Sequence, residues 1–506
     1  MATFASRILG LVREQVLAAQ FGASGLTDAF TIAFRIPNML RDLFAEGAFS
    51  SAFVPVFTEQ KQVDEQAARR LLWSLFVLLG TITLIISALM ALFAEQLVYL
   101  VTDDLFNSDK DRVLVTVQLI QVMSPFLVFV SLAALLMGAL NSLRVFFVPA
   151  LAPAFFNIVM ILCMWFLPPF VERAGFHPIM ALGVGVIAGG FVQLCMQFPM
   201  IFKKAYGPIG PLSFFNSVTG KVVNRLGIGT IGIAATQINI LVTTMIATST
   251  VIGAVSWLNY AFRLFQFPVG ILSVSIANSH LVHFAEEWKA GRREDALEVL
   301  KKSYLLSMLT IAPATALVLA LSTESVRLIF ERGLFTAFDT EQTAKALMAY
   351  GIGLPCYGLY KMLVPTFFTL DKPRIPVLIS VAAIGFNLIF CLSLVDRLGF
   401  VTLAFGTSLS MFFNCGLQSY FLKRDLKFSW TLFFNWRLLK IIVAAGLCFL
   451  AAMFTSAQLA SFAEASFMAQ ATSFLLAASA GALLYGATLF ALGEGAGLKR
   501  ALKRRG

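Results

Sequence analysis

The sequence has few charged residues and few of the side chains on which most enzymes depend. Only 13% of its 506 residues are charged, whereas a soluble domain carries about 25%. It contains no G-x-x-x-x-G-K-[ST] nucleotide loop, no G-x-S-x-G nucleophile motif and no H-E-x-x-H zinc motif. These absences argue against an ATPase, a serine hydrolase and a zinc protease. We expect a protein that is not an enzyme.

Cysteine and histidine are too sparse and too scattered to predict a metal site or a disulfide framework. The six cysteines stand singly in apolar segments, without a C-x-x-C pair. His280 and His283 lie three residues apart, but no carboxylate or cysteine joins them closely enough to suggest a metal site. Asp103 and Asp104 resemble a nucleotide-sugar site, although a solvated loop is the stronger interpretation. We therefore expect no metal and no cofactor.

Long apolar runs fill most of the remaining sequence. Hydrophobic residues make up 59% of the chain, and the mean hydropathy is +0.84. These values predict an all-α polytopic membrane protein with about 14 transmembrane helices. The predicted spans are 8–36, 40–60, 70–93, 114–140, 146–169, 178–202, 226–248, 254–285, 303–322, 344–369, 375–395, 400–422, 438–458 and 468–492.

Basic residues are distributed unequally between the predicted loops. With the N-terminus in the cytoplasm, the cytoplasmic segments hold 24 Lys and Arg residues and the opposite side holds 7. This positive-inside bias predicts that both termini are cytoplasmic. It also accounts for most of the net charge of +11, so nucleic acid is not an expected partner.

The first half of the sequence recurs weakly in the second half. Ala33-Phe34-Arg35 recurs as Ala261-Phe262-Arg263, and further matches follow in the same order at similar offsets. The pattern predicts two six-helix parallel repeats, 1–203 and 204–424, followed at 425–506 by two additional helices and a basic tail. Parallel repeats of this kind are typical of alternating-access transporters, whose substrate site lies between the two halves.

Ionisable residues are concentrated in the first sixty positions, where lipid would oppose them. They are Arg7, Arg13, Glu14, Asp28, Arg35, Arg41, Asp42 and Glu46. On one unbroken helix, the five charges from Arg7 to Arg35 fit an arc of about 120°. Gly10, Gly22 and Gly25 predict a bend in this segment, and Pro37 is expected to end it.

The balance of these charges favours an anionic substrate in a cavity. Arginine binds phosphate and carboxylate in a bidentate manner and keeps its charge when desolvated. An exporter of cationic drugs would instead need carboxylates and aromatic side chains. Two simpler interpretations remain open. Arg7 is near enough to a helix end to reach the membrane surface, and Asp28 can serve only to neutralise a buried arginine.

The charged first sixty positions contain the stretches SRILGLVRE, TDAF and RIPNMLRDLFAEGAFSSAFVP. These stretches resemble the lipid II flippases, the MurJ/MviN family of the multidrug/oligosaccharidyl-lipid/polysaccharide exporter superfamily. The resemblance implies a cationic cavity for the diphosphate and sugar-peptide head of lipid II, and a groove on the last two helices for its lipid tail. By position it implies substrate-site roles for Arg7, Arg13, Asp28, Asn38, Arg41, Glu46 and Arg263. We add Arg35 from the charge pattern and the repeat.

The sequence departs from the family pattern at several positions. Family members often have acids where Phe262 and Gln266 flank Arg263, an aspartate at Glu14 and a basic residue at Asp42. Some members resemble sodium-coupled carriers. Here the corresponding positions carry no carboxylate, so coupling to the membrane potential stays an alternative. These positions are Gln237, Asn239, Asn387, Cys391 and Thr407.

The resemblance predicts a bacterial inner-membrane flippase for undecaprenyl-diphosphate-linked peptidoglycan precursor. Its expected partners are lipid II and membrane lipids, with cell-wall synthesis proteins as candidates. The alternatives are a related exporter of other lipid-linked oligosaccharides or drugs, and a membrane scaffold that transports nothing.

Overall fold

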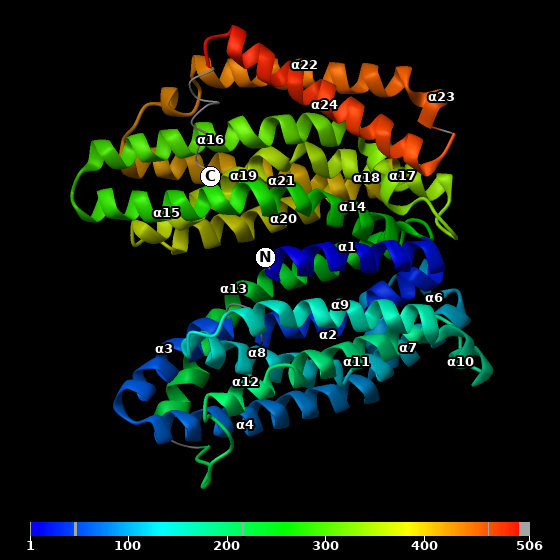
Figure 1. Ribbon diagram of the computed structural model, residues 1–506, viewed down its shortest axis with the longest axis vertical. Coiled ribbons are helices and arrows are strands. Elements are labelled where there is room, and N and C mark those ends of the chain that lie inside the picture. Colours follow the sequence, from blue (N-terminus) through cyan, green and yellow to red (C-terminus); the bar gives the residue numbers. More distant parts are fainter. Residues whose placement is uncertain (1, 45–47, 215–216, 464, 495–506) are drawn as a thin grey trace. The chain divides into compact units, whose positions relative to one another are not determined.

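The computed structural model consists of helices joined by short loops (Figure 1). It describes residues 2–44, 48–214, 217–463 and 465–494, and within them it gives no side chains for 2–4, 43–51, 217 and 223–236. These parts of the chain contain no β-strand, as predicted. The chain divides into two compact units, one of Met1–Ser256 with Arg332–Phe335 and one of Trp257–Glu331 with Thr336–Gly506.

The first unit begins with three helices that contain the charged segment. They are α1 (Ala2–Phe21), α2 (Gly25–Phe44) and α3 (Ala48–Val63). The helices that follow are α4 (Glu65–Leu92), α5 (Ala94–Val101), α6 (Asp104–Asn107), α7 (Lys110–Met123), α8 (Phe126–Ser142), α9 (Phe147–Phe166), α10 (Pro168–Arg173), α11 (Met180–Cys195), α12 (Phe198–Lys203) and α13 (Ser217–Thr248).

The second unit contains most of α14, whose first three residues belong to the first unit. Its helices are α14 (Ala254–Pro268), a π-helical turn at Val269–Ser273, α15 (Val274–Lys289), α16 (Arg293–Ala320), α17 (Ser322–Phe330), α18 (Ala337–Ile352), α19 (Leu354–Thr369), α20 (Arg374–Leu398), α21 (Val401–Leu426), α22 (Trp436–Gln458), α23 (Ala460–Ala463) and α24 (Phe467–Ala491).

Some helix lengths and offsets recur between the two halves of the chain. Helices α4 and α16 are each 28 residues long, and α3 and α15, which precede them, are each 16 residues long. The start of α9 and the start of α20 are separated by nearly the same offset as the starts of α4 and α16. This agreement supports two repeats. The predicted division at residue 203 stays a prediction, because α13 falls after that position but belongs to the first compact unit.

Nine helices or helix pairs in the described residues are long and apolar enough to cross a membrane, and Gln237–Thr248 is a shorter apolar segment. The number of 14 therefore stays a prediction. From residue 65 onward the longer helices overlap the predicted spans, although 114–140 is divided between α7 and α8, and 344–369 between α18 and α19. The boundary predicted between spans 8–36 and 40–60 is wrong, because the first helix ends at Phe21 and α2 continues through Pro37.

Gly22 explains the break after α1. Its φ is +64°, and a Cβ at this position would lie 2.7 Å from the carbonyl oxygen of Leu334. Only glycine fits both the backbone conformation and this close approach. The Leu334 N–H in turn donates to the Ala19 carbonyl at 2.9 Å. The loop segment Arg332–Phe335 is thereby attached to the end of α1.

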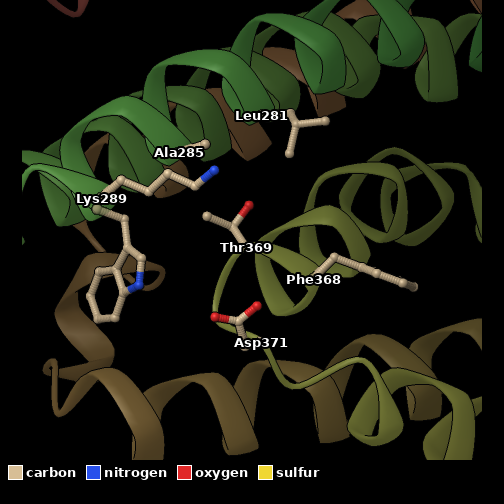
Figure 2. A pocket seen from close by; sticks show the side chains of 7 residues that line it. Leu281, Ala285, Lys289, Phe368, Thr369 and Asp371 are labelled. Atoms are coloured by element: carbon tan, nitrogen blue, oxygen red, sulfur yellow. The ribbon is translucent and has the colours of Figure 1, made fainter. Parts of the chain in front are cut away.

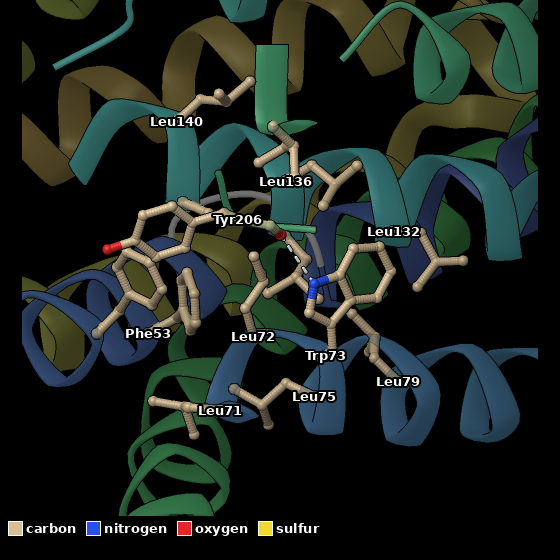
Figure 3. Close-up of a cluster of buried hydrophobic side chains, with 14 of the residues drawn as sticks. Phe53, Leu71, Leu72, Trp73, Leu75, Leu79, Leu132, Leu136, Leu140 and Tyr206 are labelled. Atoms are coloured by element: carbon tan, nitrogen blue, oxygen red, sulfur yellow. Dashed lines mark hydrogen bonds between the residues drawn. The ribbon is translucent and has the colours of Figure 1, made fainter. Parts of the chain in front are cut away.

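A buried apolar cluster holds the first unit together (Figure 3). Leucines of α4 and α8 meet there with Phe53 and Phe57 of α3. The Trp73 indole N–H donates to the Tyr206 carbonyl at 2.9 Å, so the indole nitrogen is satisfied within the cluster. The cluster fixes α3 and α4 in position relative to α8.

Small residues let α22 and α24 pack closely in the second unit, where Figure 1 shows them side by side. Ala444, Cys448 and Ala452 are buried on α22, and Ala477 and Gly481 are buried on α24. A Cβ at Gly481 would lie 2.9 Å from the Cys448 carbonyl oxygen. The larger apolar side chains of both helices, among them Leu450, Phe454 and Leu483, remain exposed for contact with lipid.

Candidate functional site

Arg13 is the most firmly held of the predicted site residues. Its guanidinium pairs with Glu14 and donates to the Asn157 side-chain oxygen of α9 at 3.1 Å. It also lies 5.9 Å from the centre of the Phe156 ring. Asn157 donates to the Ser6 carbonyl, which further ties α1 to α9. Because its side chain is only 14% exposed, Arg13 presents a charge of fixed orientation.

Asp28 is buried, and it binds backbone groups at the start of α14. Its carboxylate accepts hydrogen bonds from the N–H groups of Gly253 and Ser256, at 2.7 and 2.8 Å. The Ser256 hydroxyl donates a third, at 2.6 Å. N–H groups in the first turn of a helix have no partner within that helix, so Asp28 satisfies them and neutralises the positive end of the helix dipole.

Arg112 is a buried cation that acts on Asp28, and the sequence reasoning missed it. Its charge interacts with Asp28, and its guanidinium pairs with Asp109 at 3.1 Å and lies over the Phe106 ring. Arg112 is 8% exposed. It escaped notice because it stands beside the acids Asp109 and Asp111, where it looks like part of a solvated loop.

Arg41 and Asp42 form an ion pair that also contacts α13. The Arg41 guanidinium donates to one Asp42 oxygen at 2.7 and 3.0 Å. The Gln237 side-chain nitrogen donates to the other oxygen at 3.0 Å. Asp42 therefore neutralises its neighbour and links α2 to α13. This is a structural reason for an acid at a position where the family pattern has a basic residue.

The remaining predicted residues differ in exposure. Arg7 is exposed on α1, whereas Arg35 and Asn38 are half-buried on α2. Arg263 is exposed on α14 and belongs to the second unit. Glu46 lies outside the described residues, as does the basic tail. The structure thus groups Arg13 with Asn157, and Arg41 with Gln237.

Asn157 is a second residue that the sequence reasoning did not place in the site. The signal was present, because Phe156-Asn157 recurs as Phe386-Asn387 in the second half. That recurrence indicated duplication but did not indicate which side chain Asn157 contacts. A buried asparagine in an apolar helix needs a partner, and here the partner is Arg13.

Several of the positions expected to correspond to a sodium site contact protein atoms in this structure. Gln237 donates to Asp42, the Cys391 thiol contacts the Asn387 side-chain oxygen, and the Thr407 hydroxyl donates to the Leu403 carbonyl. Within the described residues, no group of three or more His, Cys, Asp or Glu side chains is placed to hold a metal ion.

Comparison with known proteins identifies the family of this chain. The family model described as lipid II flippase MurJ matches residues 17–479. The chain belongs to the MurJ family of lipid II flippases. A probable lipid II flippase MurJ of Rickettsia prowazekii is 33% identical over 417 residues, which cover 82% of this chain and 80% of that protein.

Other relatives agree with this family assignment. The lipid II flippase MurJ of Burkholderia cenocepacia is 33% identical over 387 residues, 76% of this chain and 74% of that protein. A solved structure, a lipid II flippase MurJ in an inward closed conformation, matches with a TM-score of 0.77 at 25% identity, over 97% of this chain and 98% of that one. A MATE multidrug transporter of the MOP superfamily matches with a TM-score of 0.70 at 12% identity, over 83% of this chain and 94% of that one, which shows the shared fold alone.

Proposed function

We propose that this protein translocates lipid II, the undecaprenyl-diphosphate-linked precursor of peptidoglycan, from the cytoplasmic to the periplasmic leaflet by alternating access. Membership of the MurJ family over residues 17–479 is the observation that carries the proposal. The chain would act in the bacterial inner membrane with both termini in the cytoplasm. This function is transport and involves no covalent chemistry by the protein.

The arginines would bind the anionic head group. Arg7, Arg13, Arg35, Arg41 and Arg263 offer guanidinium groups that match phosphate oxygens in a bidentate manner. Asn38 would add a neutral hydrogen bond. Asp28 and Glu46 would order the site and would not contact the diphosphate directly, because carboxylates repel it. The contacts of Arg13 with Glu14 and Asn157 favour this interpretation, since a preoriented cation loses less entropy on binding.

The lipid tail would lie against α22 and α24. These helices expose large apolar side chains, and their small residues face each other. A polyprenyl chain needs a long apolar surface of this kind. Cell-wall synthesis proteins stay candidate partners that would deliver or receive the substrate.

The direct test is transport in proteoliposomes. Lipid II placed in one leaflet becomes accessible to a membrane-impermeant reagent on the other side only if it is translocated. We expect transport by the wild-type protein and a loss of about tenfold or more in Arg13→Ala, because a charge-assisted contact is worth about 1.5–3 kcal/mol. Arg397→Ala is a matched control, since Arg397 is exposed on α20.

The outcomes separate the alternatives. Transport of cationic dyes without transport of lipid II would favour a drug exporter and contradict the proposal. Absence of any transport, with or without an imposed membrane potential, would favour a scaffold. Lipid II transport that Arg13→Ala leaves intact would retain the substrate but refute the role of Arg13.

A further inference from the structure

A pocket of about 490 Å³ lies within the second unit, where the last turns of α15 and α19 meet (Figure 2). Its volume is in the range of pockets that bind small molecules. Leu281, Ala285, Trp288 and Lys289 of α15 line it, together with Phe368, Thr369 and Asp371 at the end of α19. None of these residues belongs to the proposed lipid II site.

The walls of the pocket are held by buried contacts one turn away. The four lining residues of α15 have the spacing i, i+4, i+7 and i+8, so they share one face of the helix. His280 hydrogen-bonds to the Thr366 hydroxyl at 2.8 Å, which joins α15 to α19. The buried Phe284 ring stacks on Trp288 and fixes its orientation. These contacts fix the positions of the two helices and of Trp288 around the pocket.

Two opposite charges line the pocket without pairing. Lys289 and Asp371 are both exposed, and in the described part of the chain neither side chain has a salt-bridge partner. Asp371 is held in a turn with a φ of +55°, and Figure 2 shows its carboxylate near Thr369, with the Lys289 ammonium on the other side of Thr369. A ligand that carries both charges would satisfy both side chains.

The pocket lies next to the ends of two candidate membrane spans. The candidate span Ala254–Lys289 ends at a pocket residue, and another candidate span, Arg374–Leu398, begins three residues after Asp371. Arg292, Arg293 and Arg374 follow these helix ends, so the positive-inside rule places them on the cytoplasmic side. Leu281 and Phe368, which are 38% and 54% exposed, extend the pocket towards the apolar region.

We infer that this pocket binds the head group of a zwitterionic phospholipid that carries a primary ammonium, of the phosphatidylethanolamine class. Lys289 binds the phosphate, Asp371 accepts hydrogen bonds from the ammonium, and the Trp288 ring supplies a cation–π surface. Leu281 and Phe368 contact the first carbons of the acyl chains. An anionic lipid leaves Asp371 without a partner, and a choline head group has no N–H to donate.

Native mass spectrometry of the full-length, delipidated protein tests this inference. Phosphatidylethanolamine, phosphatidylcholine and phosphatidylglycerol with identical acyl chains are titrated in parallel. We expect the first to bind about fivefold more tightly than the other two, the gain of one exposed ion pair. Asp371→Asn removes this preference and keeps the turn, because asparagine tolerates a positive φ. Lys289→Gln weakens the binding of all three lipids.

Glu298→Gln is the matched control, because it removes an exposed carboxylate on α16 outside the pocket, and it leaves the preference unchanged. An unchanged melting temperature of Asp371→Asn without lipid shows that the variant is folded. Equal binding of the three lipids by the wild type overturns the inference. A preference for phosphatidylethanolamine that survives Asp371→Asn also overturns it.

Discussion

The turn after α8 and the turn after α19 are built in the same way, although they lie in different halves of the chain. Three N–H groups bond to three preceding carbonyls, in the pairs Leu143–Ala139, Arg144–Asn141 and Val145–Leu140 of the first turn and Leu370–Thr366, Asp371–Phe368 and Lys372–Phe367 of the second. The central residues both have a positive φ, 60° at Arg144 and 55° at Asp371.

Side chains at several aligned positions of the two halves differ in charge. At the offset that aligns Arg35 with Arg263, Arg41 and Asp42 correspond to Val269 and Gly270 of the π-helical turn, and Asp28 corresponds to Ser256. Arg35 and Arg263 are one of the charged pairs that the two halves share. In the described residues, the Arg41–Asp42 ion pair has no counterpart at the aligned positions of the second half.

Among the aligned positions, Asp28 and Ser256 should differ most in the unfolding free energy that is lost on substitution by alanine. Asp28→Ala leaves the N–H groups of Gly253 and Ser256 without their acceptor, at a cost of about 3 kcal/mol. Ser256→Ala removes one hydroxyl donor and costs about 1 kcal/mol. Thermal unfolding of the purified variants measures both. Equal losses would contradict the role assigned to the carboxylate.

The two positive-φ turns should respond identically to a β-branched residue. Valine is disfavoured in the left-handed region, so Arg144→Val and Asp371→Val should each cost about 1–2 kcal/mol. Glycine at either position should be tolerated. A strong effect at one turn alone, measured by thermal unfolding, would show that the two turns are not energetically equivalent.

The duplicated Phe-Asn pairs should differ in function. Asn157→Leu removes the partner of Arg13 from α9, and the loss of about 1 kcal/mol should reduce lipid II transport about fivefold. Ile158→Ala, on the lipid-exposed face of the same helix, is the control. Unchanged transport in Asn157→Leu would mean that Arg13 does not depend on this contact.

The smallest effect should be a pH dependence of local stability at the start of α7. The backbone N–H of Arg112, and then its side chain, hold the pKa of Asp109 below its usual value. A lowered pKa stabilises the folded state above the unfolded-state pKa of aspartate, and this stabilisation is lost as the pH falls through the lower, folded-state value.

Hydrogen exchange at Lys110–Arg112 should therefore accelerate on acidification in the wild type relative to Asp109→Asn, which keeps the cap without a titrating group. The corresponding helix α18 begins with the neutral cap Thr336. Identical pH dependence in the wild type and Asp109→Asn would exclude the carboxylate as the cause.

The helical class and most of the later helices could be predicted from the sequence, but the passage of α2 through Pro37 could not. Proline removes one hydrogen bond of the helix, but packing of α2 against α7 and α8 keeps the helix intact. Periodicity reports which face of a helix is apolar, and it contains no information on such tertiary compensation.

The site shows the same limit. Residue types indicated that Arg13, Asp28 and Arg41 were functional candidates, because charges in apolar helices are costly. Their partners could not be predicted. Asn157 lies 144 residues from Arg13, and Gly253, just before α14, lies 225 residues from Asp28. Contacts of this range depend on the fold, which single-sequence patterns do not specify.

Arg263 provides the most direct test of the central claim, that arginines of both repeats bind the head group of lipid II. Its sequence neighbours are Phe262 and Leu264, so no acid adjoins Arg263 in sequence. Phe262 packs on Phe265 and Tyr350. We would measure lipid II accessibility in proteoliposomes with wild type, Arg263→Lys and Arg263→Ala at equal reconstitution. The account predicts that Arg263→Ala loses transport and that Arg263→Lys retains part of it. Transport by Arg263→Ala at the wild-type rate would contradict the account.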